Sequence, residues 1–207
     1  MCYEMEFVRV INNALPIELC KDIIDKFETD SRKTPGTVNI DIVNRDIKKS
    51  TDLGITYFDD WRQLRSYVTQ YLMKALQVYF KEIENNVFRG LDLNIISGIF
   101  GKNIIPSGFQ IQKYNSTGKF VWHTDDSSVE KRLLAYIMYL NTVPVENGGS
   151  TDFLNGKSIQ PKEGSVLIFP ATWSYIHRGN VIKSGEKYII TGFIVQSNLK
   201  ICDESST

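Results

Sequence analysis

An α+β fold is predicted for this chain, with N-terminal helices packed on one sheet of an antiparallel sandwich or barrel. Two observations lead to this class. Apolar residues recur at helical spacing in two segments before residue 84, and short strand-like runs separated by turn residues follow from about residue 93. Helices first and many short strands afterwards are typical of helices that cover one sheet of a β-rich core.

The N-terminal part begins with a short predicted strand at residues 6–11 and a helix that starts near Pro16. The apolar stripe of that helix consists of Leu15, Leu19, Ile23, Ile24 and Phe27. Residues 29–54 are polar and interrupted by proline and glycine, which predicts a solvated loop; a substrate-contacting loop over 31–54 is the alternative. A longer helix is predicted over about 60–83, with its own stripe at Leu64, Val68, Tyr71, Leu72, Leu76, Val78 and Tyr79.

The C-terminal part carries the strand signals. The longer predicted strands are 109–114, 133–140, 165–169 and 188–196, and the shorter ones are 120–123, 151–153 and 174–178. Turn residues lie between them, for example Asn147-Gly148-Gly149 and Glu163-Gly164. We therefore expect one domain over 1–207, with a helical part at about 1–92, a β-rich core at about 93–198 and a polar tail at 199–207.

The composition excludes several classes of protein. The 24 basic and 24 acidic residues balance, whereas nucleic-acid and membrane-surface binders usually carry a basic excess, so we expect neither partner. Three widely spaced cysteines predict neither a disulfide framework nor a zinc site. No run approaches the roughly 18 apolar residues of a membrane span. The first residues lack the pattern of a signal peptide, so a cytoplasmic location is expected.

The chain has only two histidines, His123 and His177. On a strand, residues i and i+2 point to the same side, so His123 and Asp125 can converge on one point. With His177 they form two imidazoles and one carboxylate, the facial triad of non-haem Fe(II) oxygenases. The alternatives are that Asp125 caps a turn, that Asp126 is the acid in its place, and that His177 is a core residue.

A second pair of residues points to an anionic ligand. Lys187 and Thr191 are four residues apart on one predicted strand and face the same way. A cation aimed into an apolar interior needs a partner, because a buried unpaired ammonium is costly. A small dicarboxylate with its other end on the metal would supply that partner through a charge-assisted hydrogen bond.

Several short motifs follow one another in a fixed order. They are Gln112-Lys113-Tyr114, His123-Thr124-Asp125, Tyr139-Leu140-Asn141, Gly148-Gly149-Ser150-Thr151, and His177 followed by Lys187. In order and spacing this set resembles the prolyl-4-hydroxylase-like branch of the Fe(II)/2-oxoglutarate-dependent oxygenases. The resemblance covers about 109–196 and extends more weakly to 15–27. It implies a double-stranded β-helix, or jelly roll, as the barrel behind the helices.

The resemblance also implies roles for individual residues. His123, Asp125 and His177 would ligate Fe(II), and Lys187 would pair with the distal carboxylate of 2-oxoglutarate. Thr191 and Tyr139 would place hydroxyls near that carboxylate, and Tyr114 would line the cosubstrate pocket; ordinary core packing is the alternative for these three. Phe193 departs from several relatives, which carry tryptophan there.

The activity that the resemblance implies is hydroxylation of an unactivated C–H bond, most simply of a prolyl residue in a peptide or protein. O2 and 2-oxoglutarate would be consumed, succinate and CO2 released, and ascorbate would serve as a reductant. The groove for the substrate is predicted near Trp122, Trp173 and Arg178, with core packing as the alternative for the two tryptophans. A free amino acid, another small metabolite or an alkylated nucleobase are alternative substrates, and neutral charge disfavours the nucleobase. A catalytically silent barrel remains an alternative; three ligands without thiolates disfavour structural zinc.

Overall fold

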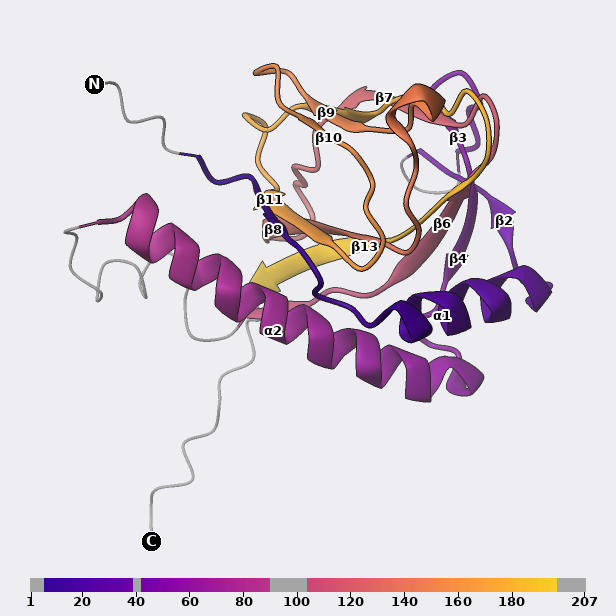
Figure 1. Ribbon diagram of the computed structural model, residues 1–207, viewed down its shortest axis with the longest axis horizontal. Helices are drawn as coiled ribbons and strands as arrows, with labels where there is room; N and C mark the ends of the chain where they lie inside the picture. The colour runs from indigo at the N-terminus through magenta and orange to yellow at the C-terminus, as the bar shows by residue number, and fades with distance from the viewer. Residues whose placement is uncertain (1–5, 39–41, 90–103, 197–207) are drawn as a thin grey trace, which may run out of the picture.

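The computed structural model describes residues 6–38, 42–89 and 104–196 and shows two antiparallel sheets that face each other (Figure 1). The larger sheet has the strand order β1-β11-β8-β13-β6-β4-β2, with β5 paired to β13, and the smaller has the order β10-β9-β12-β7-β3. Helices α1 and α2 lie together on the larger sheet, on the side away from the smaller one (Figure 1).

The helices are α1 (Ile17–Thr29) and α2 (Arg62–Asn86), the latter preceded by a 3-10 turn at Asp59–Trp61. The strands of the larger sheet are β1 (Arg9–Ile11), β2 (Thr34–Pro35), β4 (Thr51–Gly54), β5 (Ile104–Pro106), β6 (Gln110–Tyr114), β8 (Arg132–Tyr139), β11 (Val166–Pro170) and β13 (Lys187–Gln196). Those of the smaller sheet are β3 (Lys48–Lys49), β7 (Lys119–His123), β9 (Thr151–Phe153), β10 (Ser158–Ile159) and β12 (His177–Gly179).

Strand β8 explains how the layers are held together. Its alternate residues Leu134, Tyr136 and Met138 belong to the core cluster shared with the helices, while Ala135 and Ile137 belong to the cluster between the sheets. Side chains alternate across a strand, so an apolar run of this length is buried on both faces. The buried stripe of α1 (Leu19, Cys20, Ile23, Phe27) and that of α2 (Val68, Leu72, Ala75, Leu76, Tyr79, Ile83) complete the outer cluster.

The predicted elements are present with shifted ends. Residues 151–153 are β9 as predicted, and the other long strands and both helices differ by up to three residues at an end. Two predicted strands are shorter than expected, since 6–11 contains β1 only from Arg9 and 174–178 contributes only the first residues of β12. These differences are of the size expected where helices and strands fray.

The prediction of a solvated loop over residues 29–54 is wrong where the structure has strands, at residues 34–35, 48–49 and 51–54. Strands β2 and β4 extend the larger sheet beyond β6, and β3 pairs with β7 in the smaller sheet. Lys48 and Asp52 are buried and form an ion pair of 2.6 Å between Nζ and Oδ2. The charges of Lys48 and Asp52 therefore pair with each other inside the protein, where the sequence pattern indicated solvent.

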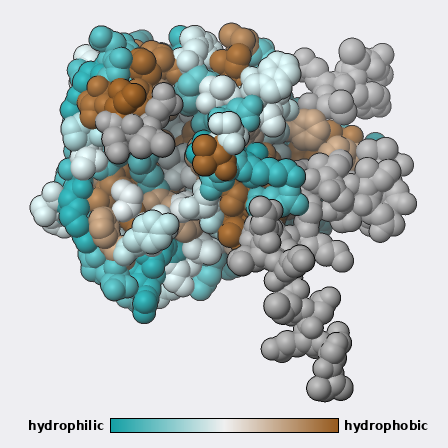
Figure 2. Space-filling view, turned by 180° about the vertical axis from the view of Figure 1, so that it is seen from behind, coloured by the Kyte–Doolittle hydropathy of each residue, from teal (hydrophilic) through white to brown (hydrophobic). Residues whose placement is uncertain are grey.

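The remaining parts of the domain prediction have different outcomes. The described residues among the first 92 contribute four strands besides the two helices, so this part is not helical alone. The tail 199–207 lies outside the described residues, and the single-domain division stays a prediction. None of the helices described is long and apolar enough to cross a membrane. On the face seen in Figure 2, hydrophobic residues form separate patches among hydrophilic ones.

Candidate active site

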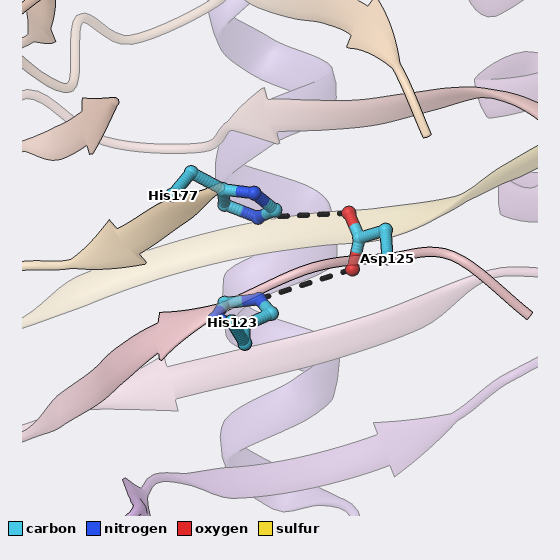
Figure 3. Close-up of side chains that lie close together, drawn as sticks. All are labelled: His123, Asp125 and His177. Atoms are coloured by element: carbon cyan, nitrogen blue, oxygen red, sulfur yellow. Dashed lines mark ion pairs between the residues drawn. The ribbon is translucent and has the colours of Figure 1, made fainter. Parts of the chain in front are cut away.

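His123, Asp125 and His177 meet at one end of the space between the two sheets. His123 ends β7 and lies opposite His177, the first residue of β12, in the antiparallel pairing. Asp125 follows two residues after β7, and its oxygens lie 3.8 Å from His123 Nε2 and 3.5 Å from His177 Nε2 (Figure 3). One ligand atom from each residue lies within 4.8 Å of the others, which is the arrangement a metal ion requires.

The neighbouring acid, Asp126, does not share this position. It is exposed, and its carboxylate accepts a hydrogen bond of 3.0 Å from the backbone N–H of Ser127, as a turn residue does. The carboxylate of Asp125 instead points to both imidazoles (Figure 3). Of the two acids that the sequence left open, the geometry therefore favours Asp125 as a ligand.

Each histidine is held in one tautomer by the backbone. His123 Nδ1 lies 2.8 Å from the carbonyl oxygen of Val121, and His177 Nδ1 lies 3.0 Å from that of Tyr175. A carbonyl can only accept, so each Nδ1 carries the proton and each Nε2 keeps a lone pair directed towards Asp125. This is the outer-shell arrangement that orients metal-binding imidazoles.

The protonation states also suit a cation. Burial, together with the neighbouring His177, lowers the pKa of His123 to about 4, and burial lowers the pKa of His177 to about 4. Both imidazoles are therefore neutral at pH 7 and free to donate electron pairs. Burial raises the pKa of Asp125, although His123 and Arg132 oppose this, so a nearby positive ion would stabilise its carboxylate. The donor set fits a divalent transition metal.

Aromatic side chains fix the two rings. Phe120 stacks on His123 with ring centres 3.6 Å apart and an angle of 16° between the planes. Phe169 meets the ring of His177 edge-on at 4.7 Å. Rings packed in this way lose little further conformational freedom when a metal binds.

The triad opens into a cavity of about 460 Å³ between the sheets. Of the residues that the sequence assigned to a cosubstrate, Lys187, Thr191 and Tyr114 line it, together with Phe193. Apolar walls are added by Phe120, Ile137 and Ile189. The strand pattern thus brings the metal candidates and three of the four cosubstrate candidates into one space.

Lys187 is the buried cation of this cavity whose charge has no counter-ion. It is 2% exposed; its Nζ donates to the carbonyl of Gly149 at 2.9 Å and lies 5.0 Å from the centre of the Tyr114 ring. Among the described residues no carboxylate forms an ion pair with Nζ. Burial lowers the pKa of Lys187 to about 8, although the charge of Asp152, which pairs with Arg178, opposes this shift. A carboxylate ligand would offset this cost, so the site fits the distal end of a small dicarboxylate.

The hydroxyls around the cavity differ in part from the prediction. Thr191 donates to the carbonyl of Tyr136 at 3.1 Å, and Tyr114 donates to Gln112 Oε1 at 2.7 Å. Tyr139 is fully buried and does not line the cavity, since its hydroxyl lies 2.8 Å from Thr151 Oγ1 and Thr151 stands in front of it. Of these two residues it is Thr151, within the Gly-Gly-x-Thr motif, that lines the cavity.

Several lining residues had no signal in the sequence. Lys48 reaches the cavity from β3, and its ion pair with Asp52 could not be read from a polar segment. Arg132 donates to the carbonyl of Asp125 at 3.2 Å, stacks on Phe193 at 3.8 Å and pairs with Glu130 at 3.1 Å. Arg132 therefore holds the segment that carries the acidic member of the triad.

Trp122, Trp173 and Arg178 do not line the cavity. Arg178 follows His177 on β12 and points away from it, because successive side chains alternate across a strand. Its guanidinium donates to Asp152 Oδ2 at 3.0 and 2.9 Å and stacks on Trp122 at 4.6 Å. Trp173 is 72% exposed. Their place in a substrate groove stays a prediction, without support from the cavity lining.

Comparison with known proteins agrees with this arrangement. Residues 109–195 match the family model of the 2OG-Fe(II) oxygenase superfamily. No curated protein matches the chain by sequence.

Solved structures are similar over most of the chain. A viral collagen prolyl hydroxylase from Paramecium Bursaria Chlorella virus-1 covers 93% of this chain and 97% of its own, with a TM-score of 0.62 and 16% identity. A Pseudomonas putida prolyl-4-hydroxylase matches over 91% of this chain and 92% of its own, with a TM-score of 0.64 and 16% identity. A Trichoplax adhaerens prolyl hydroxylase in complex with a hypoxia-inducible factor peptide fragment matches over 91% of this chain and 83% of its own, with a TM-score of 0.69 and 14% identity. These likenesses confirm the predicted α+β fold with a double-stranded β-helix.

Proposed function

We propose that this chain, which carries a 2OG-Fe(II) oxygenase domain over residues 109–195, hydroxylates prolyl residues in a peptide or protein. The observation that carries the proposal is the pairing of two features in one cavity. Two neutral imidazoles and a carboxylate converge at one place, and the uncompensated ammonium of Lys187 lines the same cavity. A metal ion and a dicarboxylate are the two ligands that these features accommodate.

The metal in the proposal is Fe(II), held by Nε2 of His123, Nε2 of His177 and the carboxylate of Asp125. Two histidines and one carboxylate on one face leave coordination positions open, which is the pattern of non-haem Fe(II) oxygenases. When bound, iron supplies the one-electron and oxygen chemistry that amino-acid side chains lack. The chain itself fixes the ligands: backbone carbonyls set the tautomers, and Phe120 and Phe169 set the ring planes.

The cosubstrate in the proposal is 2-oxoglutarate, with Lys187 as the partner of its distal carboxylate. Burial raises the pKa of Tyr114 well above its usual value, so its phenol stays protonated and able to donate. Thr151 and Thr191 add hydroxyls to the same cavity. Apolar side chains around them exclude water, which strengthens each of these polar contacts. Overall, 2-oxoglutarate, O2 and the C–H bond would give succinate, CO2 and an alcohol.

The prolyl substrate has indirect support. The three similar structures are described as prolyl hydroxylases, and one of them contains a peptide. At 14–16% identity this likeness concerns the fold, so the substrate of the present chain needs its own test. A peptide is favoured over a free amino acid because the cavity adjoins a further hollow, described below, with which it shares four lining residues.

The test combines product analysis with a matched pair of variants. Protein, Fe(II), 2-oxoglutarate and ascorbate are incubated in air with proline-containing peptides, and succinate and a gain of one oxygen per peptide are measured by mass spectrometry. The wild type is expected to give both products. Asp125→Ala is expected to abolish them, while Asp126→Ala, which removes an exposed carboxylate one residue away, is expected to retain them.

Three results would count against the proposal. Retained activity in Asp125→Ala would remove the triad assignment. Succinate without a modified peptide, together with oxidation of a free amino acid, would retain the oxygenase and replace the substrate. No consumption of 2-oxoglutarate under any condition would leave a barrel without this catalytic activity.

A further inference from the structure

A second hollow of about 360 Å³ adjoins the cavity that contains the triad. Four residues line both spaces, namely Thr56, Ser107, Gly108 and Phe109. The two spaces therefore lie next to each other at these four residues. The other wall of the hollow is the first part of α2, and we call this hollow the α2 groove.

The α2 groove is basic and rich in hydroxyls. Helix α2 contributes the guanidinium groups of Arg62 and Arg65 and the hydroxyls of Ser66 and Thr69. No acidic residue occurs among the described residues that line it. A groove with this lining is complementary to an anionic group.

The two arginines differ in how firmly they are held. Arg65 is half-buried, and its Nη1 donates to the carbonyls of Ile55 at 2.9 Å and Phe58 at 3.3 Å. This fixes the guanidinium and leaves its Nη2 donors for a ligand. Arg62 is exposed, and its contact with Asp59 is an ion pair of 3.5 Å between side chains that are 77% and 91% exposed. Such a pair is weak in water and is easily exchanged for a ligand carboxylate.

Besides Asp125 of the triad, one acid lines the neighbouring cavity among the described residues, and it does not cancel this charge. Glu130 pairs with Arg132 at 3.1 Å, so its carboxylate is already compensated. The α2 groove thus presents two cations to a ligand that extends from the triad cavity. Planar guanidinium groups bind carboxylates through paired hydrogen bonds, which favours an Asp or Glu side chain as the ligand.

We propose that the α2 groove binds an acidic side chain of the same polypeptide whose target residue enters the triad cavity. This inference rests on the proposed function. Only a chain molecule can occupy the cavity and continue past Gly108 into the groove. The groove would therefore select substrates that carry Asp or Glu at a fixed distance in sequence from the hydroxylated residue.

The experiment starts from one proline-containing peptide that the wild type hydroxylates. In a series of variants of this peptide, each other position in turn carries Glu, and a matched peptide carries Gln at that position. We expect one position at which Glu lowers KM about tenfold relative to Gln, as a charge-assisted hydrogen bond predicts, with kcat little changed. Arg62→Gln and Arg65→Gln are expected to reduce this preference, and Arg65→Lys to retain part of it. Lys74→Gln, an exposed cation further along α2 that does not line the groove, is the control and should leave it unchanged.

Charge reversal separates binding from folding, because Arg62 is exposed and its replacement disturbs no buried contact. Arg62→Glu is expected to disfavour the Glu peptide and to favour one with Lys at the same position. Equal KM values for Glu and Gln peptides at every position in the wild type would overturn the inference, as would an equal effect of Lys74→Gln. Hydroxylation of the Gln peptide distinguishes the two levels: a wild type that hydroxylates it with the same KM as every Glu peptide contradicts this inference alone, whereas a wild type that hydroxylates no proline-containing peptide contradicts the proposed function itself.

Discussion

Lys187 concentrates the ligand chemistry of the cavity in one side chain. Burial lowers its pKa to about 8 from an ordinary value of 10.5, although the charge of Asp152 opposes the shift. The charged form is therefore held at a cost that an anionic ligand can offset. The same residue would be protonated at neutral pH and would lose its proton only slightly above it.

This gives a prediction for the binding of 2-oxoglutarate. Above pH 8 Lys187 must take up a proton from solvent when the ligand binds, so the Kd of 2-oxoglutarate should rise by up to about tenfold for each pH unit. The measurement is titration calorimetry of 2-oxoglutarate into the Fe(II) protein without oxygen, between pH 7 and pH 9.5. Lys187→Arg, which stays protonated throughout, is the control and should bind with little dependence on pH. An equally flat curve for the wild type would contradict the role given to Lys187.

The positions of single side chains were predictable where the alternation along a strand alone decides on which face of the sheet they lie. The spacing of His123 and Asp125 and the scarcity of histidine were sufficient for the proposed triad, and the structure brings those three side chains together. Tyr139 illustrates the limit. It lies on the expected face of β8, but Thr151 of β9 stands between it and the cavity, and such layering depends on tertiary packing.

At the scale of elements, β3 and β4 carry the buried pair of Lys48 and Asp52. Their side chains are 5% and 4% exposed, and Ser50 Oγ donates to Asp52 Oδ1 at 2.7 Å. Sequence patterns assign such a polar segment to solvent, because they show which residues are charged but not which of them form ion pairs in the folded protein. The apolar strands and amphipathic helices were predictable for the opposite reason, since burial of one or both faces leaves a periodic signal.

Breaking this pair should destabilise the fold. Asp52→Asn leaves the ammonium of Lys48 buried without its counter-charge, and we expect a loss of about 3 to 5 kcal/mol in the free energy of unfolding. Denaturant unfolding followed by circular dichroism measures it. Asp46→Asn, an exposed acid in the same segment, should change stability by less than about 0.5 kcal/mol.

A double variant tests whether the loss comes from the unpaired charge. Replacing both partners, as Lys48→Met with Asp52→Leu, should recover most of the stability, because neither charge then remains in the core. A double variant as unstable as Asp52→Asn would instead point to a packing defect.

At the scale of the whole molecule, helices cover the outer face of the larger sheet, whose other face is turned to the smaller sheet (Figure 1). The triad cavity lies between the two sheets. The sequence predicted the helices, the β-rich core and, by resemblance, its jelly-roll form. It did not predict the α2 groove, because that surface joins residues 56, 62–69 and 106–109, which no local pattern connects. Trp122 and Arg178 lie on the face of the smaller sheet away from the cavity, because each is next to a cavity-lining histidine on its strand and successive side chains alternate.

The central claim is that Fe(II) and 2-oxoglutarate bind together in the cavity defined by His123, Asp125, His177 and Lys187. Its most direct measurement is an optical titration of 2-oxoglutarate into the Fe(II) protein without oxygen. The account predicts a weak visible charge-transfer band that saturates with the ligand, is absent in His177→Ala, and requires higher 2-oxoglutarate concentrations in Lys187→Ala. A protein that binds Fe(II) and yet develops no such band at any concentration of 2-oxoglutarate would contradict it.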